Sequence, residues 1–140
     1  MNAIKEKEII DLIPKNITSE GVIHVINRGR VKSTYLGILK NYIELTDELI
    51  SNSLNISIRT YRNYKKKSIT INPDLQERII LLLALAKHGK EIFGSSKEFS
   101  NWLTTKNFQL GKQPIDYLNT ISGIKLVDDR LTGIEFGDNA

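Results

Sequence analysis

The stretch Thr46–Lys65, TDELISNSLNISIRTYRNYK, predicts two short helices joined by a tight turn. Thr46 is a hydroxyl cap, and the two acids after it face the positive end of the first helix dipole. Ser51 is small enough for two helices to cross closely. Asn55 tolerates the left-handed backbone that the turn needs, and Ser57 caps the second helix. This arrangement is typical of a helix-turn-helix.

The second of these helices is predicted to have an aromatic face and a polar face. Tyr61 and Tyr64 are three residues apart and are expected to face the core. The side chains that then point outward are suited to nucleic acid, because Arg and Asn read base edges and Lys binds phosphates. The predicted DNA-binding residues are Arg59, Thr60, Arg62, Asn63, Lys65, Lys66 and Lys67.

Charge is distributed unevenly along the 140 residues, although the net charge is only +4. Residues 56–72 contain five basic and no acidic side chains, whereas residues 126–140 contain one basic and four acidic side chains. A basic block indicates a polyanionic partner, and an acidic end indicates a cationic one. An ordinary helical corner with a solvated basic helix is the alternative, but the missing acids favour DNA.

Helical spacing of apolar residues continues through the rest of the chain, so we predict an all-α fold. The longest helix is expected to begin at Pro73 and to end at Gly89, with His88 interacting with its negative end. Ser33 is expected to open a helix. The segment 68–72 is predicted to be an extended connector, and Trp102, the only tryptophan, is predicted to be mostly buried.

Several function classes are disfavoured by composition. The chain has no cysteine, which excludes disulfides, thiol catalysis and Cys-ligated zinc. His24 is expected at the edge of the core, and Asp128 with Asp129 is interpreted as a solvated pair, so we predict no metal, cofactor or enzymatic activity. No apolar run is long enough to span a membrane, and residues 1–13 lack the apolar core of a secretory signal, which favours a cytoplasmic protein.

The block 92–137 contains a series of short motifs whose chemistry alone predicts a small helical interaction unit. They are Phe93-Gly94, Trp102-Leu103, Leu110-Gly111, Pro114-Ile115-Asp116-Tyr117-Leu118 and Ile134-Glu135-Phe136-Gly137. In this order they resemble the toxin-binding domain of the Xre/MbcA/ParS antitoxin family, and the preceding helix-turn-helix resembles that family's Xre-like part. Lys112 and Gln113 stand where a glycine and a threonine are usual in the family.

The resemblance implies a non-enzymatic antitoxin that pairs with a RES-domain toxin, which degrades NAD⁺, or with a related ADP-ribosylating toxin. The antitoxin would cover the toxin's active site and bind its own promoter DNA, as a dimer and in a complex with the toxin. The implied division is residues 1–32 with an open role, 33–90 for an Xre-like helix-turn-helix region, and 91–140 for the toxin-binding domain. A stand-alone transcriptional regulator with a dimerising or sensing C-terminal domain, and a pure interaction module, remain alternatives.

The last predicted helix has one apolar stripe and one exposed face. The stripe Ile124, Val127, Leu131 and Ile134 is expected to hold the helix to the domain. The residues off the stripe and in the acidic tail are predicted to contact the toxin, with Phe136 as an apolar anchor and Glu135 or Asp138 facing cationic groups. This predicted toxin-binding set is Lys125, Asp129, Thr132, Glu135, Phe136, Gly137, Asp138 and Asn139.

Overall fold

The computed structural model describes residues 3–14, 16–29 and 31–137. These residues form helices and one isolated β-bridge, which confirms the predicted all-α fold. The elements are α1 (Ala3–Leu12), α2 (Ser19–Gly29), α3 (Tyr35–Ile43), α4 (Asp47–Leu54), α5 (Ile58–Lys66), α6 (Pro73–Phe93), α7 (Ser96–Leu103), the 3₁₀ helix η1 (Pro114–Tyr117) and α8 (Ile121–Glu135).

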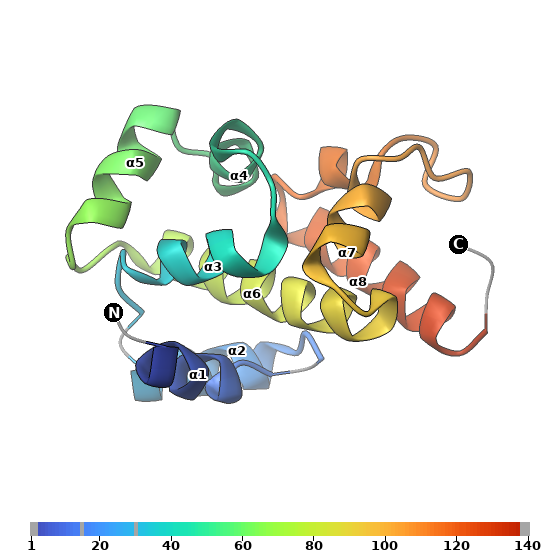
Figure 1. Cartoon of the computed structure of the whole chain (residues 1–140). Coiled ribbons are helices and arrows are strands. Elements are labelled where there is room, and N and C mark those ends of the chain that lie inside the picture. Colours follow the sequence, from blue (N-terminus) through green and yellow to red (C-terminus); the bar gives the residue numbers. More distant parts are fainter. Residues whose placement is uncertain (1–2, 15, 30, 138–140) are drawn as a thin grey trace.

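Helix α6 runs through the centre of the molecule, with α1 and α2 on one side and α3 on the other (Figure 1). It packs against α2, α3, α7 and α8, and its segment 79–86 is buried on every face. The helix continues across residue 90, where the sequence predicts a domain boundary. No helix in the described part of the chain is long and apolar enough to cross a membrane.

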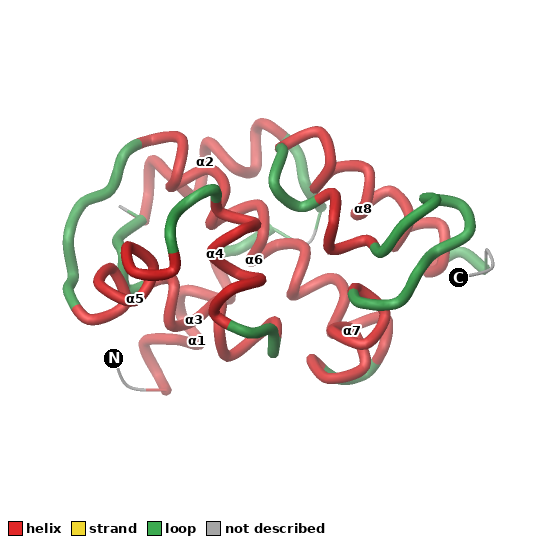
Figure 2. Tube along the Cα trace, turned by 90° about the horizontal axis from the view of Figure 1, so that it is seen from above, coloured by secondary structure: helices red, strands yellow, loops and turns green. Residues whose placement is uncertain are grey.

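The caps and the turn of the α4–α5 pair have the structure that the sequence predicts. The Oγ1 atom of Thr46 accepts a hydrogen bond from the backbone N–H of Leu49 at 3.2 Å, and Ser57 caps α5 in the same way. Asn55 ends α4 in the left-handed conformation, with φ of 57°. Ser51 is buried, and its carbonyl accepts a hydrogen bond from the N–H of Ile56 in the turn at 3.2 Å. These short-range interactions fix the angle between α4 and α5, which are viewed from above in Figure 2.

Ser33 does not begin α3, contrary to the prediction from sequence. The helix begins at Tyr35, and the buried Ser33 hydroxyl instead donates to the carbonyl of Lys67 and accepts from the N–H of Ile69. Beside it, Lys32 and Thr70 form the single antiparallel bridge of the described residues. The segment after α5 is therefore an extended connector, as predicted, and Ser33 fixes its position.

The long helix α6 ends five residues later than predicted. Gly89 lies inside the helix, which continues to Phe93 and stops at Gly94, whose φ is 86°. Gly89 is needed for packing, because a Cβ at this position would lie 2.3 Å from the ring of Phe99 on α7. The prediction was wrong because the glycine's role depends on a residue in another helix.

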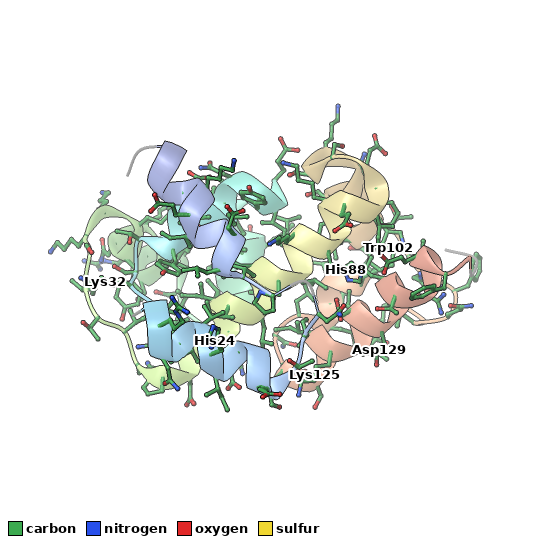
Figure 3. All side chains as sticks on the ribbon, turned by 90° about the horizontal axis from the view of Figure 1, so that it is seen from below. His24, Lys32, His88, Trp102, Lys125 and Asp129 are labelled. Atoms are coloured by element: carbon green, nitrogen blue, oxygen red, sulfur yellow. The ribbon has the colours of Figure 1, made fainter. Side chains whose placement is uncertain are left out.

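The packing corrects the sequence prediction for His24 and agrees with the one for Trp102. His24 is exposed on α2, since Val22 and Val25 occupy the buried positions of that helix. Trp102 packs against the core and is mostly buried, as predicted, and its ring centroid lies 5.5 Å from that of Phe93. Both labelled side chains can be followed in Figure 3.

Candidate functional site

Helix α5 presents its polar face to solvent and its aromatic face to the core. Tyr61 is fully buried and Tyr64 is half-buried. Thr60 is half-buried, and its hydroxyl accepts a hydrogen bond from the Ser57 hydroxyl at 2.9 Å. The exposed members of the predicted DNA-binding set are Arg59, Arg62, Asn63, Lys66 and Lys67.

Asp47 holds two of the predicted DNA-binding cations in ion pairs. Its carboxylate lies 3.1 Å from Arg62 Nε and 3.4 Å from Lys65 Nζ, and it also accepts from Lys40 Nζ of α3 at 3.1 Å. The hydrogen bond from Lys40, then that from Arg62, lowers the pKa of Asp47 to about 2. Asp47 thus joins α3, α4 and α5, and it leaves Lys65 less available to phosphate than Lys66.

Four of the eight predicted toxin-binding residues lie on α8, and two more follow directly after it. The stripe residues Ile124, Val127 and Leu131 are buried, and Ile134 is half-buried. Lys125 and Asp129 lie together on the outer side of the helix (Figure 3). Of the remaining predicted residues, Glu135, Phe136 and Gly137 are exposed, Thr132 is half-buried, and Asp138 and Asn139 lie outside the described residues.

His88 is buried between two carboxylates and connects α6 to α8. Its Nδ1 atom lies 2.9 Å from Asp128 Oδ1, and its Nε2 atom lies 3.1 Å from Glu135 Oε1. A neutral imidazole has one donor only, so both contacts are satisfied as N–H donors when the ring is protonated. The hydrogen bond to Asp128 raises the pKa of His88, although burial opposes the shift.

This contact corrects two interpretations made from the sequence. Asp128 is only 7% exposed and is not half of a solvated pair with Asp129. His88 is not a partner of a helix end, because α6 continues past it. The two residues are 40 positions apart in the sequence, and no local pattern connects them.

We expect the free energy of unfolding to decrease as the pH rises through the pKa of His88. The folded-state pKa lies above the ordinary value of about 6.5, so the contribution is fully present below about pH 6.5 and is lost as the pH rises through the folded-state pKa. Urea denaturation between about pH 6 and about pH 9 measures this slope. His88→Gln should remove the slope, and an unchanged slope in this variant would contradict the assignment.

The loop between α7 and η1 has a defined backbone and an exposed aromatic side chain. Asn107 is buried, and its Oδ1 atom accepts from the N–H of Gln109 at 2.9 Å and from that of Leu110 at 3.0 Å. Phe108, which lies between Asn107 and Gln109, is 94% exposed. Phe108 is not among the residues predicted from the sequence, where its only signal is an aromatic residue in a polar segment.

The carbonyl of Asn119 connects the turn after α4 to the beginning of α8. It accepts from Asn55 Nδ2 at 2.9 Å and from Arg78 Nη1 at 2.9 Å. The next residue, Thr120, caps α8 through the N–H of Gly123 at 2.9 Å. The position of α8 therefore depends on the helix pair α4–α5 as well as on α6.

Residues 88–137 match the family of the antitoxin Xre/MbcA/ParS C-terminal toxin-binding domain. The match begins at His88 and includes α7, the loop with Phe108, η1 and α8. No curated protein matches the chain. The match covers 50 of the 140 residues, from the end of α6 to the residue after Phe136. The segment 88–137 is therefore similar to the toxin-binding domain of Xre/MbcA/ParS-type antitoxins, which confirms the resemblance drawn from the motifs of this segment.

Proposed function

We propose that this antitoxin neutralises a RES-type toxin, which degrades NAD⁺, or a related ADP-ribosylating toxin, and has no catalytic activity of its own. The observation that carries the proposal is the family match over residues 88–137. The end of α8 would cover the active site of the toxin. A site that binds the phosphates of a dinucleotide is cationic, which suits the exposed acids Asp129 and Glu135.

The helix pair α4–α5 would act as a helix-turn-helix that binds the promoter of the antitoxin's own operon. The exposed Arg59, Asn63, Lys66 and Lys67, together with the absence of acids from residues 56–72, support this role. In this proposal residues 33–90 serve DNA and residues 91–140 serve the toxin. The antitoxin acts in the cytoplasm as a dimer that also forms a complex with the toxin, and residues 1–32 have no assigned role.

Neutralisation is expected to depend on the acidic end of the chain. An antitoxin that ends at Phe136, and the variant Asp138→Lys, should fail to protect cells that express the toxin encoded beside the antitoxin gene. The fold should survive, because a short terminal segment contributes little to a core. Growth and cellular NAD⁺ are the readouts.

Asp11→Lys is a matched control for this experiment, since it reverses an exposed acid on α1, outside the segment 88–137. It should protect cells as well as the wild type. If the truncated chain and Asp138→Lys also fold, bind and protect like the wild type, inhibition comes from another surface.

DNA binding is expected to separate into base contacts and phosphate contacts. Arg59→Ala should weaken binding to the promoter by about 1–3 kcal/mol and relax specificity at one base pair. Lys66→Ala should weaken binding to all sequences about equally and lower the salt slope by about one. Fluorescence anisotropy over a salt series measures both effects. Arg28→Ala on α2 is the control, and unchanged binding in both test variants would show that α5 does not enter the groove.

A further inference from the structure

Two phenylalanines are the most exposed large hydrophobic side chains of the described residues. Phe108 is 94% exposed and Phe136 is 81% exposed. Both lie within the segment 88–137 that matches the toxin-binding domain. The loop between α7 and η1 and the end of α8 also lie at the same end of the molecule, opposite α5, in both views (Figures 1 and 2).

Phe108 projects from a loop whose backbone is closed by hydrogen bonds within the loop and to η1. The N–H of Gly111 donates to the carbonyl of Asn107 at 2.8 Å, and the Tyr117 hydroxyl donates to the carbonyl of Leu110. Gly111 has φ of 84°, which suits this tight turn. The exposure of Phe108 is therefore a property of a defined loop. Such preorganisation lowers the entropic cost of binding.

Phe136 is held at the end of α8 in a comparable way. Its N–H donates to the carbonyl of Thr132 at 3.1 Å, so it continues the last turn of the helix. The preceding Glu135 accepts from His88 Nε2 at 3.1 Å, which fastens this turn to α6. Each aromatic ring is thus presented to solvent from a backbone that the domain fixes independently.

We propose that Phe108 and Phe136 are two separate aromatic anchors for the toxin, so that the loop between α7 and η1 forms a second contact beside the end of α8. This inference rests on the proposed function. The toxin is the occupant because both anchors belong to the matched domain, and the outer face of α8 leads directly to Phe136. Buried aromatic anchors dominate many protein interfaces.

The charges around the anchors define the partner surface further. The exposed Lys106 and Lys112 flank Phe108 in the sequence of the loop, whereas Phe136 follows the exposed Glu135. The toxin would therefore receive Phe108 in an apolar pocket with an acidic rim, and Phe136 near the cationic active site. Two contacts of opposite charge also fix the orientation of the complex.

The test measures binding of the purified toxin, encoded beside the antitoxin gene, to full-length antitoxin variants by calorimetry. Phe108→Ala and Phe136→Ala should each raise the Kd by at least about thirty-fold, as expected for dominant interface residues. Gln109→Ala is the matched control in the same loop and should change the Kd by less than about three-fold. Phe108→Ala should leave the Tm unchanged, because the side chain is 94% exposed.

The outcomes separate this inference from the proposed function. If the wild type binds and neutralises the toxin while Phe108→Ala binds equally well, the second anchor is excluded and the proposed function stands. If the wild type does not bind the toxin, both are overturned. If Phe108→Ala dissociates a dimer in sedimentation velocity but binds the toxin normally, the loop is an interface between copies of this chain, which also overturns the inference.

Discussion

Replacing His88 with alanine is expected to lower the free energy of unfolding by about 3–5 kcal/mol, the usual cost of removing one member of a buried ion pair. Asp128, which is 7% exposed, would lose its partner at 2.9 Å. The last turn of α8 would lose its contact with α6 through Glu135. The loss would therefore destabilise the toxin-binding domain in particular.

Urea denaturation at about pH 6, where the contribution of His88 is fully present, measures this effect. The chain provides a matched control in His24, its only other histidine, which is exposed on α2. His24→Ala should change the free energy of unfolding by less than about 0.5 kcal/mol. Equal effects of the two substitutions would show that the contacts of His88 with Asp128 and Glu135 contribute no stability.

Replacing Gly123 with alanine is expected to lower the free energy of unfolding by about 3 kcal/mol, at the upper end of overpacking effects. A Cβ at this position would lie 1.8 Å from the carbonyl oxygen of Tyr117. This obstacle is backbone, so relief requires η1 to move away from the beginning of α8. Thermal and urea unfolding both report the loss.

Gly37→Ala provides the opposite expectation within the same chain. Gly37 lies inside α3. Apart from its two chain neighbours and the nearby backbone of α3, no atom would lie within 4 Å of an added Cβ. Alanine should raise the free energy of unfolding by about 0.5–1 kcal/mol, because it restricts the unfolded chain and suits a helix. If both glycine variants change stability in the same direction, the steric explanation for Gly123 is wrong.

The features predicted correctly from the sequence depend on neighbours within a few residues. The caps Thr46 and Ser57 and the left-handed Asn55 act on backbone groups no more than four positions away. Their chemistry is complete in the local sequence. For the same reason, the pattern of apolar residues was sufficient to predict an all-α fold.

The features missed depend on residues that are distant in the sequence. The role of Gly89 is set by Phe99, and the role of His88 is set by Asp128 and Glu135. The exposure of Phe108 depends on the position of its loop relative to the rest of the folded domain. The spacing of residues in the sequence does not reveal these contacts. His88 and Gly89 were therefore predicted to lie at the end of a helix.

The candidate DNA-binding set shows the same division. Helical spacing placed the exposed Arg59, Asn63 and Lys66 opposite the buried Tyr61, as the structure has them. It gave no indication that Asp47, on the preceding helix, would hold Arg62 and Lys65 in ion pairs. The DNA-binding role of these residues stays a prediction.

The central position of α6 has a consequence for how such an antitoxin can evolve. A recombination event that replaced the chain after residue 90 would retain the buried side chains of α6 while exchanging α7 and α8, which pack against them. In the hybrid, the buried face of α6 would pack against helices α7 and α8 from another protein, whose side chains are not complementary to it. Partner specificity is therefore expected to diverge by substitution at exposed positions such as Phe108 and Lys125, with the interior inherited as one piece.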